Sequence, residues 1–177
     1  MKKKLQGPAL AKALQRVRMV IFDFDGVMTD NRVWVSQDGT EIVACNRSDG
    51  LGVGFLRKLG IPMAIVSTEQ NPVVHRRAEK LKIECFAPCE DKLVQTTELL
   101  KRHGLKLEDA AFIGNDVNDL EILKRVGLPV VVQDAYQEVK RVASLVLKQK
   151  GGHGAVREFC DLLLASQSKP VRTRKTK

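Results

Sequence analysis

The chain has 177 residues and a formal net charge of +9, and 44% of its residues are hydrophobic. These values are those of one globular domain with a sizeable core. No apolar run approaches the roughly 20 residues of a membrane-spanning helix, and no apolar signal-peptide core follows the basic N-terminus. We therefore expect a cytoplasmic protein with no membrane partner.

The positive charge is concentrated at the two ends of the chain. Residues 2–4 and 169–177 supply much of the excess of Lys and Arg, and terminal runs of this kind are commonly frayed. The chain has one Trp and one Tyr, which leaves few aromatic side chains for base stacking. We expect solvated tails and no nucleic-acid partner, with a positive field that helps to gather an anionic substrate.

Apolar runs alternate with helical patterns along the rest of the chain. The runs predict strands at residues 19–22, 63–66, 85–86, 110–113, 130–132 and 145–147. Apolar residues at helical spacing predict helices at residues 51–59, 73–81, 92–103, 120–126, 136–142 and 155–165. This alternation, with near-continuous apolar strands, predicts a doubly wound α/β fold in which helices cover both faces of a parallel sheet.

A β-hairpin is expected to interrupt this pattern after the first strand. Residues 33–35 and 41–44 are rich in β-formers and flank Asp38-Gly39, a strong hairpin signal. A two-stranded hairpin cannot bury apolar side chains on both faces, so an exposed ribbon of this kind predicts an interface, the alternative being that it packs onto its own domain. Its apolar residues are Val33, Trp34, Val35, Ile42 and Val43.

Polar residues that follow the strands are the candidates for chemistry, because open parallel sheets bind ligands beyond the carboxyl ends of their strands. Asp23 and Asp25 follow the first strand and can approach one pocket from the same face. Two such carboxylates repel each other unless a cation or a proton intervenes, and an oxygen-rich site suits Mg²⁺. The alternative interpretation of Asp-x-Asp-Gly is an ordinary turn.

Three further segments add to this pair. Ser67 and Thr68 follow the second sheet strand, where a hydroxyl and helix N–H groups can bind phosphate, although Ser67 alone is more typical of an N-cap. Lys92 stands at a helix N-terminus, the end that disfavours a cation, which suggests a role in neutralising phosphate, although Lys92 alone is more typical of a solvated side chain. Residues 114–119, Gly-Asn-Asp-Val-Asn-Asp, indicate a second metal-binding edge or a turn and cap.

The order of these four segments resembles the signature of the haloacid dehalogenase-like (HAD) phosphatase superfamily, over residues 23–119. The Asp-x-Asp-Gly-x-x-Thr-Asp opening, the hairpin, residues 47–50 and the Gly-Gly-His-Gly-Ala-Val-Arg-Glu segment at 151–158 further resemble the 3-deoxy-D-manno-octulosonate 8-phosphate phosphatases. Relatives of that family include phosphatases of sialic-acid-type 9-phosphates and the C-terminal domain of vertebrate CMP-sialate synthetases.

The resemblance implies the domain organisation and the assembly. It implies a HAD-like phosphatase domain at residues 18–166 without a separate cap domain. An N-terminal extension at residues 1–17 precedes this domain, and a basic flexible tail at 167–177 follows it. It also implies a homotetramer whose hairpins form a barrel and whose neighbouring subunits close each active site.

The resemblance further implies a Mg²⁺-dependent phosphatase acting on a phosphorylated sugar acid. Asp23 would attack phosphorus to form an aspartyl-phosphate, and Asp25 would protonate the leaving oxygen and then activate water. The implied phosphate-binding residues are Ser67, Thr68 and Lys92. The implied metal ligands are Asp23, Asp25 through its backbone carbonyl, and Asn115 or Asp116. The implied substrate-binding residues are Asn46, Asp49, Gly50, Glu69 and Arg77.

Two residues depart from the pattern of the octulosonate phosphatases. Asn115 stands where the sugar-acid phosphatases commonly have Asp, which removes one negative charge from the metal site. This change keeps open an alternative, a catalytically weak oligomerisation or regulatory module that assists a sialate-type cytidylyltransferase. Glu69 stands where the octulosonate phosphatases have Arg, which favours a nine-carbon, nonulosonate-type 9-phosphate over the eight-carbon one.

Overall fold

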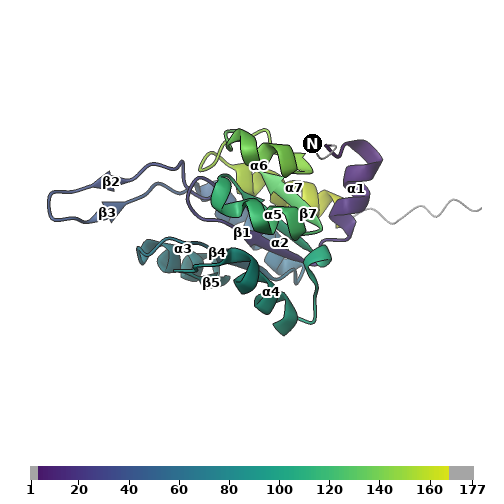
Figure 1. Ribbon diagram of the computed structural model, residues 1–177, viewed down its shortest axis with the longest axis horizontal. Helices are drawn as coiled ribbons and strands as arrows, with labels where there is room; N and C mark the ends of the chain where they lie inside the picture. Colours follow the sequence, from purple (N-terminus) through teal and green to yellow (C-terminus); the bar gives the residue numbers. More distant parts are fainter. Residues whose placement is uncertain (1–3, 168–177) are drawn as a thin grey trace, which may run out of the picture.

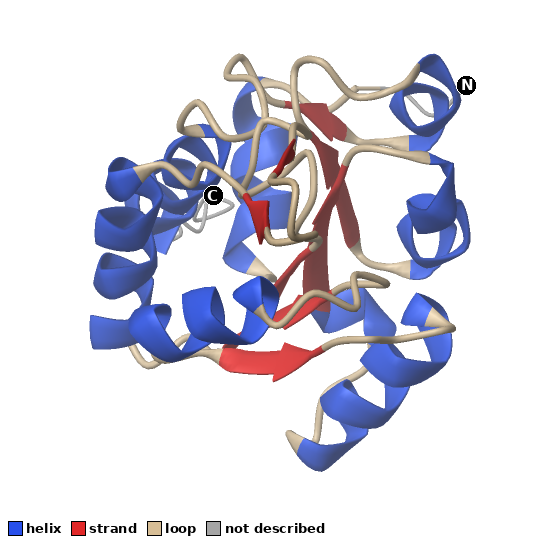
Figure 2. Ribbon diagram, turned by 90° about the vertical axis from the view of Figure 1, so that its left-hand side faces the viewer, coloured by secondary structure: helices blue, strands red, loops and turns tan. Residues whose placement is uncertain are grey.

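The computed structural model describes residues 4–167 and contains one six-stranded sheet in the order β5-β4-β1-β6-β7-β8, with every pair parallel. Its strands are β1 (Met19–Phe22), β4 (Met63–Val66), β5 (Glu84–Phe86), β6 (Ala110–Gly114), β7 (Leu128–Val131) and β8 (Leu145–Val146). Helices lie on both sides of this sheet (Figure 2). The predicted doubly wound α/β fold without a separate cap domain is confirmed for the described residues.

The helices that connect and cover the strands are α1 (Gly7–Gln15), α2 (Arg47–Lys58), α3 (Val73–Leu81), α4 (Lys92–Arg102), α5 (Leu120–Arg125), α6 (Gln137–Val142) and α7 (Ala155–Gln167). Two short 3₁₀ turns, η1 (Leu107–Asp109) and η2 (Val117–Asp119), flank β6. Helix α7 packs against both α1 and α2, whereas α5 packs against α4 and α6. In the described part of the chain, none of the helices has the length and apolarity needed to cross a bilayer.

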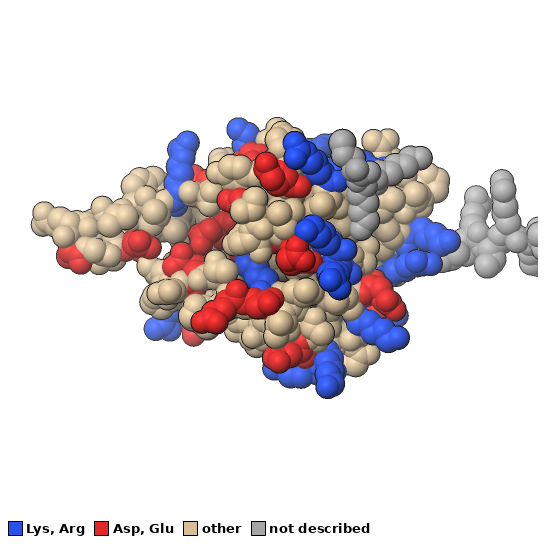
Figure 3. Space-filling view, viewed as in Figure 1, with Lys and Arg blue, Asp and Glu red and all other residues tan. Residues whose placement is uncertain are grey.

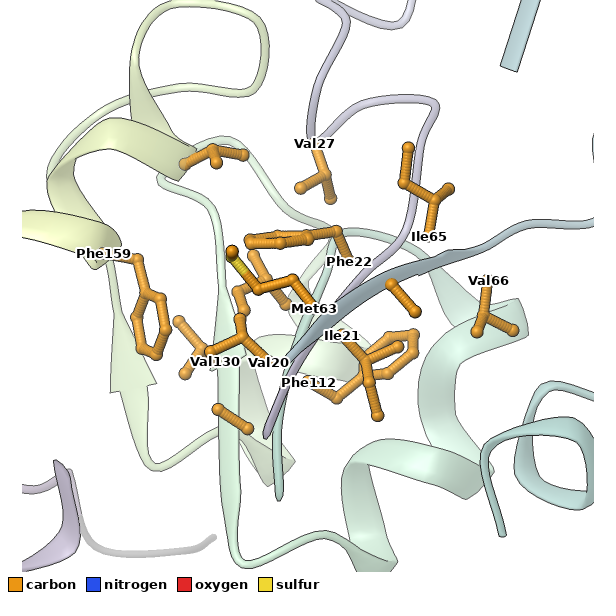
Figure 4. Close-up of a cluster of buried hydrophobic side chains, with 14 of the residues drawn as sticks. Val20, Ile21, Phe22, Val27, Met63, Ile65, Val66, Phe112, Val130 and Phe159 are labelled. Carbon is orange, nitrogen blue, oxygen red and sulfur yellow. The ribbon is translucent and has the colours of Figure 1, made fainter. Parts of the chain in front are cut away.

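The core lies between the sheet and its helices. Every residue of β1, β4, β6 and β7 is buried, as expected for the inner strands of a parallel sheet. Figure 4 shows the large side chains Phe22, Phe112 and Phe159 among the aliphatic residues of this cluster, and all three are fully buried. The ends of these strands are therefore attached to the closely packed core.

The hairpin consists of β2 (Trp34–Val35) and β3 (Glu41–Ile42), paired antiparallel with Trp34 opposite Ile42. It projects away from the body of the domain (Figure 1). Gly39 supplies the turn with φ +83°, a conformation that favours glycine. The hairpin prediction is confirmed, with paired strands shorter than the β-rich runs suggested.

Two helical segments differ from the sequence prediction. Residues 7–15, within the predicted N-terminal extension, form α1, which buries Leu14 and packs against α7. Lys4 is also ordered, because its ammonium donates to the carbonyls of Lys140 and, at 2.7 Å, Ala143. Helix α2 begins at Arg47, four residues before the predicted start at Leu51. The predicted basic tail lies outside the described residues, except for residue 167 at the end of α7.

Candidate active site

The ends of three neighbouring strands, β4, β1 and β6, meet at one cavity of about 260 Å³. Asp23 and Asp25 reach it from the end of β1, as their alternation on one face predicts. The residues that line it are Asp23, Asp25, Asn31, Ser67, Thr68, Asn115, Asp116, Val117 and Asn118. The structure therefore brings together the residues that the sequence assigned to nucleophile, acid, phosphate and metal, and it does so where parallel sheets bind ligands.

Lys92 stands at the first turn of α4 and joins two buried carboxylates. Its ammonium lies 2.8 Å from Asp23 Oδ1 and 2.7 Å from Asp119 Oδ1, and the Lys92 residue is only 4% exposed. Asp91 caps the helix by accepting from the N–H groups of Leu93 and Val94. A buried lysine held in this way is a fixed positive charge beside Asp23, which lines the cavity.

The sequence placed Asp119 in the segment at residues 114–119 without giving it a role of its own, yet it organises the site. It is fully buried, and its Oδ2 accepts from the N–H of Asn115 at 2.9 Å and of Asp116 at 3.4 Å. A β-carbon on Gly114 would lie 2.4 Å from the same Oδ2, so only glycine fits there. The spacing of Asp119 four residues after Asn115 in the Gly-Asn-Asp-x-x-Asp segment was the available signal.

The electrostatics of the cavity call for a further cation. Burial and the neighbouring Asp119 carboxylate raise the pKa of Asp23, although Lys92 acts in the opposite direction. Burial alone would lower the pKa of Lys92, but Asp23 and Asp119 outweigh it and raise that pKa. Two carboxylates thus share one ammonium, and a divalent cation beside Asp23 would balance the remaining negative charge.

The oxygen atoms at the end of β6 fit such a cation. Asn115 Oδ1 is buried and has no hydrogen-bond partner among the described residues, so it is free to act as a neutral ligand. Within residues 4–167 no three His, Cys, Asp or Glu side chains form a metal-binding group. Mg²⁺ does not require one, because it keeps several waters and binds few protein oxygens. Asp23, Asn115 and Asp116 around the cavity suit it.

Asp25 lies in a different environment from Asp23. Its Oδ1 accepts from the hydroxyl of Thr29 at 3.3 Å. Burial, and next the neighbouring carboxylate of Glu69, raise the pKa of Asp25 to about 6. A carboxyl that titrates near neutrality can both donate and accept a proton at working pH. The two carboxylates at the end of β1 are thus suited to two different roles.

Ser67 lines the cavity at the end of β4, and Glu69 follows in the same turn. Ser67 is buried at the end of β4, and its Oγ accepts from the Glu69 N–H at 3.2 Å. The Glu69 side chain in turn accepts from the Asn71 N–H at 2.7 Å. This turn holds the Ser67 hydroxyl in the cavity and the Glu69 carboxylate beside Asp25.

The five predicted substrate-binding residues do not line this cavity: Glu69 lies beside Asp25, and the other four are Asn46, Asp49, Gly50 and Arg77. Asn46 caps α2 by accepting from the Ser48 N–H at 2.9 Å, and Arg77 donates to the Asn46 carbonyl at 2.8 Å. Asp49 is 1% exposed and accepts from the Arg157 N–H at 2.9 Å. Within the described chain, these contacts connect α2, α3 and α7 and leave a substrate role for the four residues a prediction.

The sequence profile of the haloacid dehalogenase-like hydrolases matches residues 63–159. The chain belongs to this family. It is 38% identical over 167 residues to the 3-deoxy-D-manno-octulosonate 8-phosphate phosphatase KdsC of Yersinia pestis, covering 92% of this chain and 89% of that one. The KdsC phosphatase of Escherichia coli K12 is 35% identical over 161 residues, with coverage of 90% and 85%.

Comparison with solved structures also places the chain in this family. The 3-deoxy-D-manno-octulosonate 8-phosphate phosphatase of Moraxella catarrhalis, in complex with magnesium, phosphate and the sugar acid, superposes with a TM-score of 0.87 at 31% identity, covering 89% of this chain and 91% of that one. The corresponding enzyme of Yersinia pestis gives a TM-score of 0.87 at 36% identity, with coverage of 89% and 86%.

Proposed function

We propose that the chain is a Mg²⁺-dependent phosphatase that hydrolyses a phosphorylated sugar acid through an aspartyl-phosphate on Asp23. The observation that carries the proposal is the buried ion-pair network of Asp23, Lys92 and Asp119 beside Asp25 at the sheet edge. The names of the similar phosphatases support the substrate class. Phosphate release from a panel of sugar phosphates, measured with Mg²⁺ and with EDTA, tests it.

The proposed reaction has two steps, formation and hydrolysis of the aspartyl-phosphate. First, an Asp23 oxygen bonds to phosphorus, the bond between phosphorus and the sugar oxygen breaks, and Asp25 gives its proton to that oxygen. Then Asp25 takes a proton from water, the water oxygen bonds to phosphorus, and the bond to Asp23 breaks to release phosphate. Lys92, already 2.8 Å from Asp23, and the Ser67 hydroxyl hold phosphate oxygens during both steps.

Mg²⁺ bound by Asp23, by Asn115 or Asp116, and by the backbone carbonyl of Asp25 would supply positive charge against the phosphate oxygens. Asn115 in place of a carboxylate lowers the negative charge around it and favours weaker binding of the cation. This one feature supports the second candidate, a catalytically weak oligomerisation or regulatory module that assists a sialate-type cytidylyltransferase. Turnover of any sugar-acid phosphate in the panel at an ordinary enzymatic rate excludes that candidate.

The substrate preference is proposed to lie with a nonulosonate-type 9-phosphate. Glu69 puts a negative charge beside Asp25, where it repels a substrate carboxylate and can accept hydrogen bonds from sugar hydroxyls. An Arg at this place would instead pair with the carboxylate through two charge-assisted hydrogen bonds. The alternative is that Glu69 only accepts from the Asn71 N–H as part of the turn after β4.

We predict that Glu69→Arg shifts kcat/KM toward the eight-carbon 3-deoxy-D-manno-octulosonate 8-phosphate by about 10-fold or more, the scale of one charge-assisted contact. The measurement compares the eight-carbon and nine-carbon phosphates for both proteins. Glu79→Arg, an exposed charge reversal on α3, is the matched control and leaves the ratio unchanged. A wild-type preference for the eight-carbon substrate that Glu69→Arg does not alter would show that Glu69 does not select the substrate.

The hairpin supports assembly into a homotetramer. Its Val33, Trp34, Val35 and Ile42 side chains are 48% to 63% exposed, a ribbon of large apolar groups that extends from the body. Acidic side chains lie along the hairpin, and both acidic and basic side chains lie near its base on the face in Figure 3. A phosphorylated acid approaching this region would gain from basic groups of a neighbouring subunit, which supports the proposal that neighbours close each site.

We predict that light scattering at micromolar concentration gives four times the mass of one chain. Replacing both Trp34 and Ile42, which are cross-strand partners, by Ser lowers that mass because it removes the apolar ribbon. Leu59→Ser, which removes a 50% exposed side chain at the C-terminal end of α2, is the control and keeps the wild-type mass. A monomeric wild-type protein would contradict both the tetramer and the closure of the site by a neighbour.

A further inference from the structure

The Gly151-Gly152 turn lies directly against the loop that carries Asp25. A β-carbon on Gly151 would lie only 1.9 Å from the Gly26 carbonyl oxygen. At Gly152, where φ is +67°, it would lie 2.4 Å from a backbone nitrogen of the same loop. The Gly152 N–H also donates to the Val27 carbonyl at 3.1 Å. The two backbones are in contact, and neither glycine leaves room for a side chain.

The turn is held in place from outside the cavity. The Gly151 N–H donates to the exposed Asp134 carboxylate at 3.0 Å, after β7. The side-chain amide of Asn46, which caps α2, donates to the Gly152 carbonyl at 3.4 Å. These contacts fix the turn relative to the sheet and α2, so the turn acts as a rigid support for the loop.

The buried Thr29 side chain links the backbone of this loop to the Asp25 carboxylate. The Thr29 hydroxyl accepts from the Gly26 N–H at 3.1 Å and donates to Asp25 Oδ1 at 3.3 Å, and Thr29 is fully buried. On its other side the loop meets Asn115, whose side-chain nitrogen would lie 2.0 Å from a β-carbon on Gly26. The loop is thus confined between the turn and the end of β6.

We propose that Gly151 and Gly152 are positioning residues that set where Asp25 lies for its proton transfer to the sugar oxygen. The inference rests on the proposed role of Asp25 as the acid. Displacing the loop moves the proton donor, whereas Asp23 stays fixed by its N–H bond to the Ile113 carbonyl at 2.9 Å and by Lys92. Transfer of a proton tolerates little displacement of the donor.

The test uses two substrates that differ in their need for a proton, both at saturating Mg²⁺. The alkoxide leaving group of 3-deoxy-D-manno-octulosonate 8-phosphate needs protonation, whereas the dinitrophenolate of 2,4-dinitrophenyl phosphate departs without it. We expect Gly151→Ala to lower kcat/KM, which covers only the steps up to departure of the leaving group, on the order of 10- to 100-fold for the sugar phosphate and less than about 3-fold for the aryl phosphate. Gly154→Ala is the control: it strains the same turn, at φ +97°, but its β-carbon meets only Ser48 Oγ at 3.6 Å.

The inference would be overturned if Gly151→Ala lowered kcat/KM equally for the two substrates. It would also be overturned if Gly154→Ala showed the same selective loss. If Gly151→Ala does not fold, Asp134→Ala takes its place in the test. This variant replaces an exposed side chain and removes the acceptor of the Gly151 N–H. It should show a smaller loss confined to the sugar phosphate, and no selective loss there would also overturn the inference. Asp25→Asn separates the two proposals, because equal losses in that variant would contradict the acid role of Asp25 itself.

Discussion

Asp23→Asn will abolish turnover, lowering kcat on the order of 10⁴-fold or more, as loss of a catalytic nucleophile does. The amide has almost the shape of the carboxylate but cannot form the aspartyl-phosphate. EDTA will also abolish the activity of the wild-type enzyme, and added Mg²⁺ will restore it. The measurement is phosphate release from a sugar phosphate under saturating conditions. A variant that turns over at the wild-type rate would show that Asp23 is not the nucleophile.

The same substitution will leave the fold intact and its stability in EDTA equal or higher. Burial and Asp119 raise the pKa of Asp23, so the charged form of this carboxylate is disfavoured in the folded state. The neutral amide removes that penalty and leaves Lys92 paired with Asp119 at 2.7 Å. The control, Asp161→Asn on α7, removes only an exposed i,i+4 ion pair with Arg157 and changes neither activity nor stability beyond about 0.5 kcal/mol. Chemical denaturation in EDTA provides the comparison, and a Asp23→Asn variant that unfolds would invalidate the kinetic result.

The parts of the fold that the sequence predicted are those where one local signal dominates. Buried strands such as β1 and β4 appear as continuous apolar runs, and their predicted bounds match the structure. Helix α2 began earlier than predicted because Arg-Ser-Asp-Gly at its start has little helical pattern and depends on the Asn46 cap. Helix α1 was missed because its stability comes from packing Leu14 near α7, a tertiary contact that the basic N-terminus concealed.

The candidate site was likewise predictable only in part. Asp23, Ser67 and Asn115 follow buried strands, and sheet topology alone brings them to one edge. The sequence could not reveal that the Asp119 carboxylate turns back to bond Lys92 and the Asn115 N–H, because this depends on the η2 turn. Nor could it reveal that Asp49 faces the start of α7 instead of the cavity. Order along the chain indicates which loops meet, while side-chain direction depends on the packing between them.

Lys92→Met will abolish activity and will also destabilise the protein by about 3–5 kcal/mol, the cost of removing one partner from a buried charge cluster. Methionine fills the space of the lysine stem but leaves the Asp23 and Asp119 carboxylates without a positive partner. The measurement is denaturant unfolding in EDTA at pH 8. Lys101→Met, an exposed change in the last turn of the same helix, is the control and should stay within about 0.5 kcal/mol of wild type.

The stability deficit of Lys92→Met will grow as the pH rises. The pKa of Asp23 is already raised in the folded state, and removal of the ammonium will raise it further. A carboxyl with a raised folded-state pKa keeps its proton in the folded state after the unfolded chain has released it. Its stabilising contribution is therefore present at low pH and is lost as the pH rises through the folded-state pKa.

Lys92 itself stays charged throughout this range, because its pKa is raised above 10.5. The difference in unfolding free energy from wild type should thus be smaller at about pH 5 than at about pH 8. A difference that does not change with pH would show that Lys92 does not neutralise the negative charge of these two carboxylates.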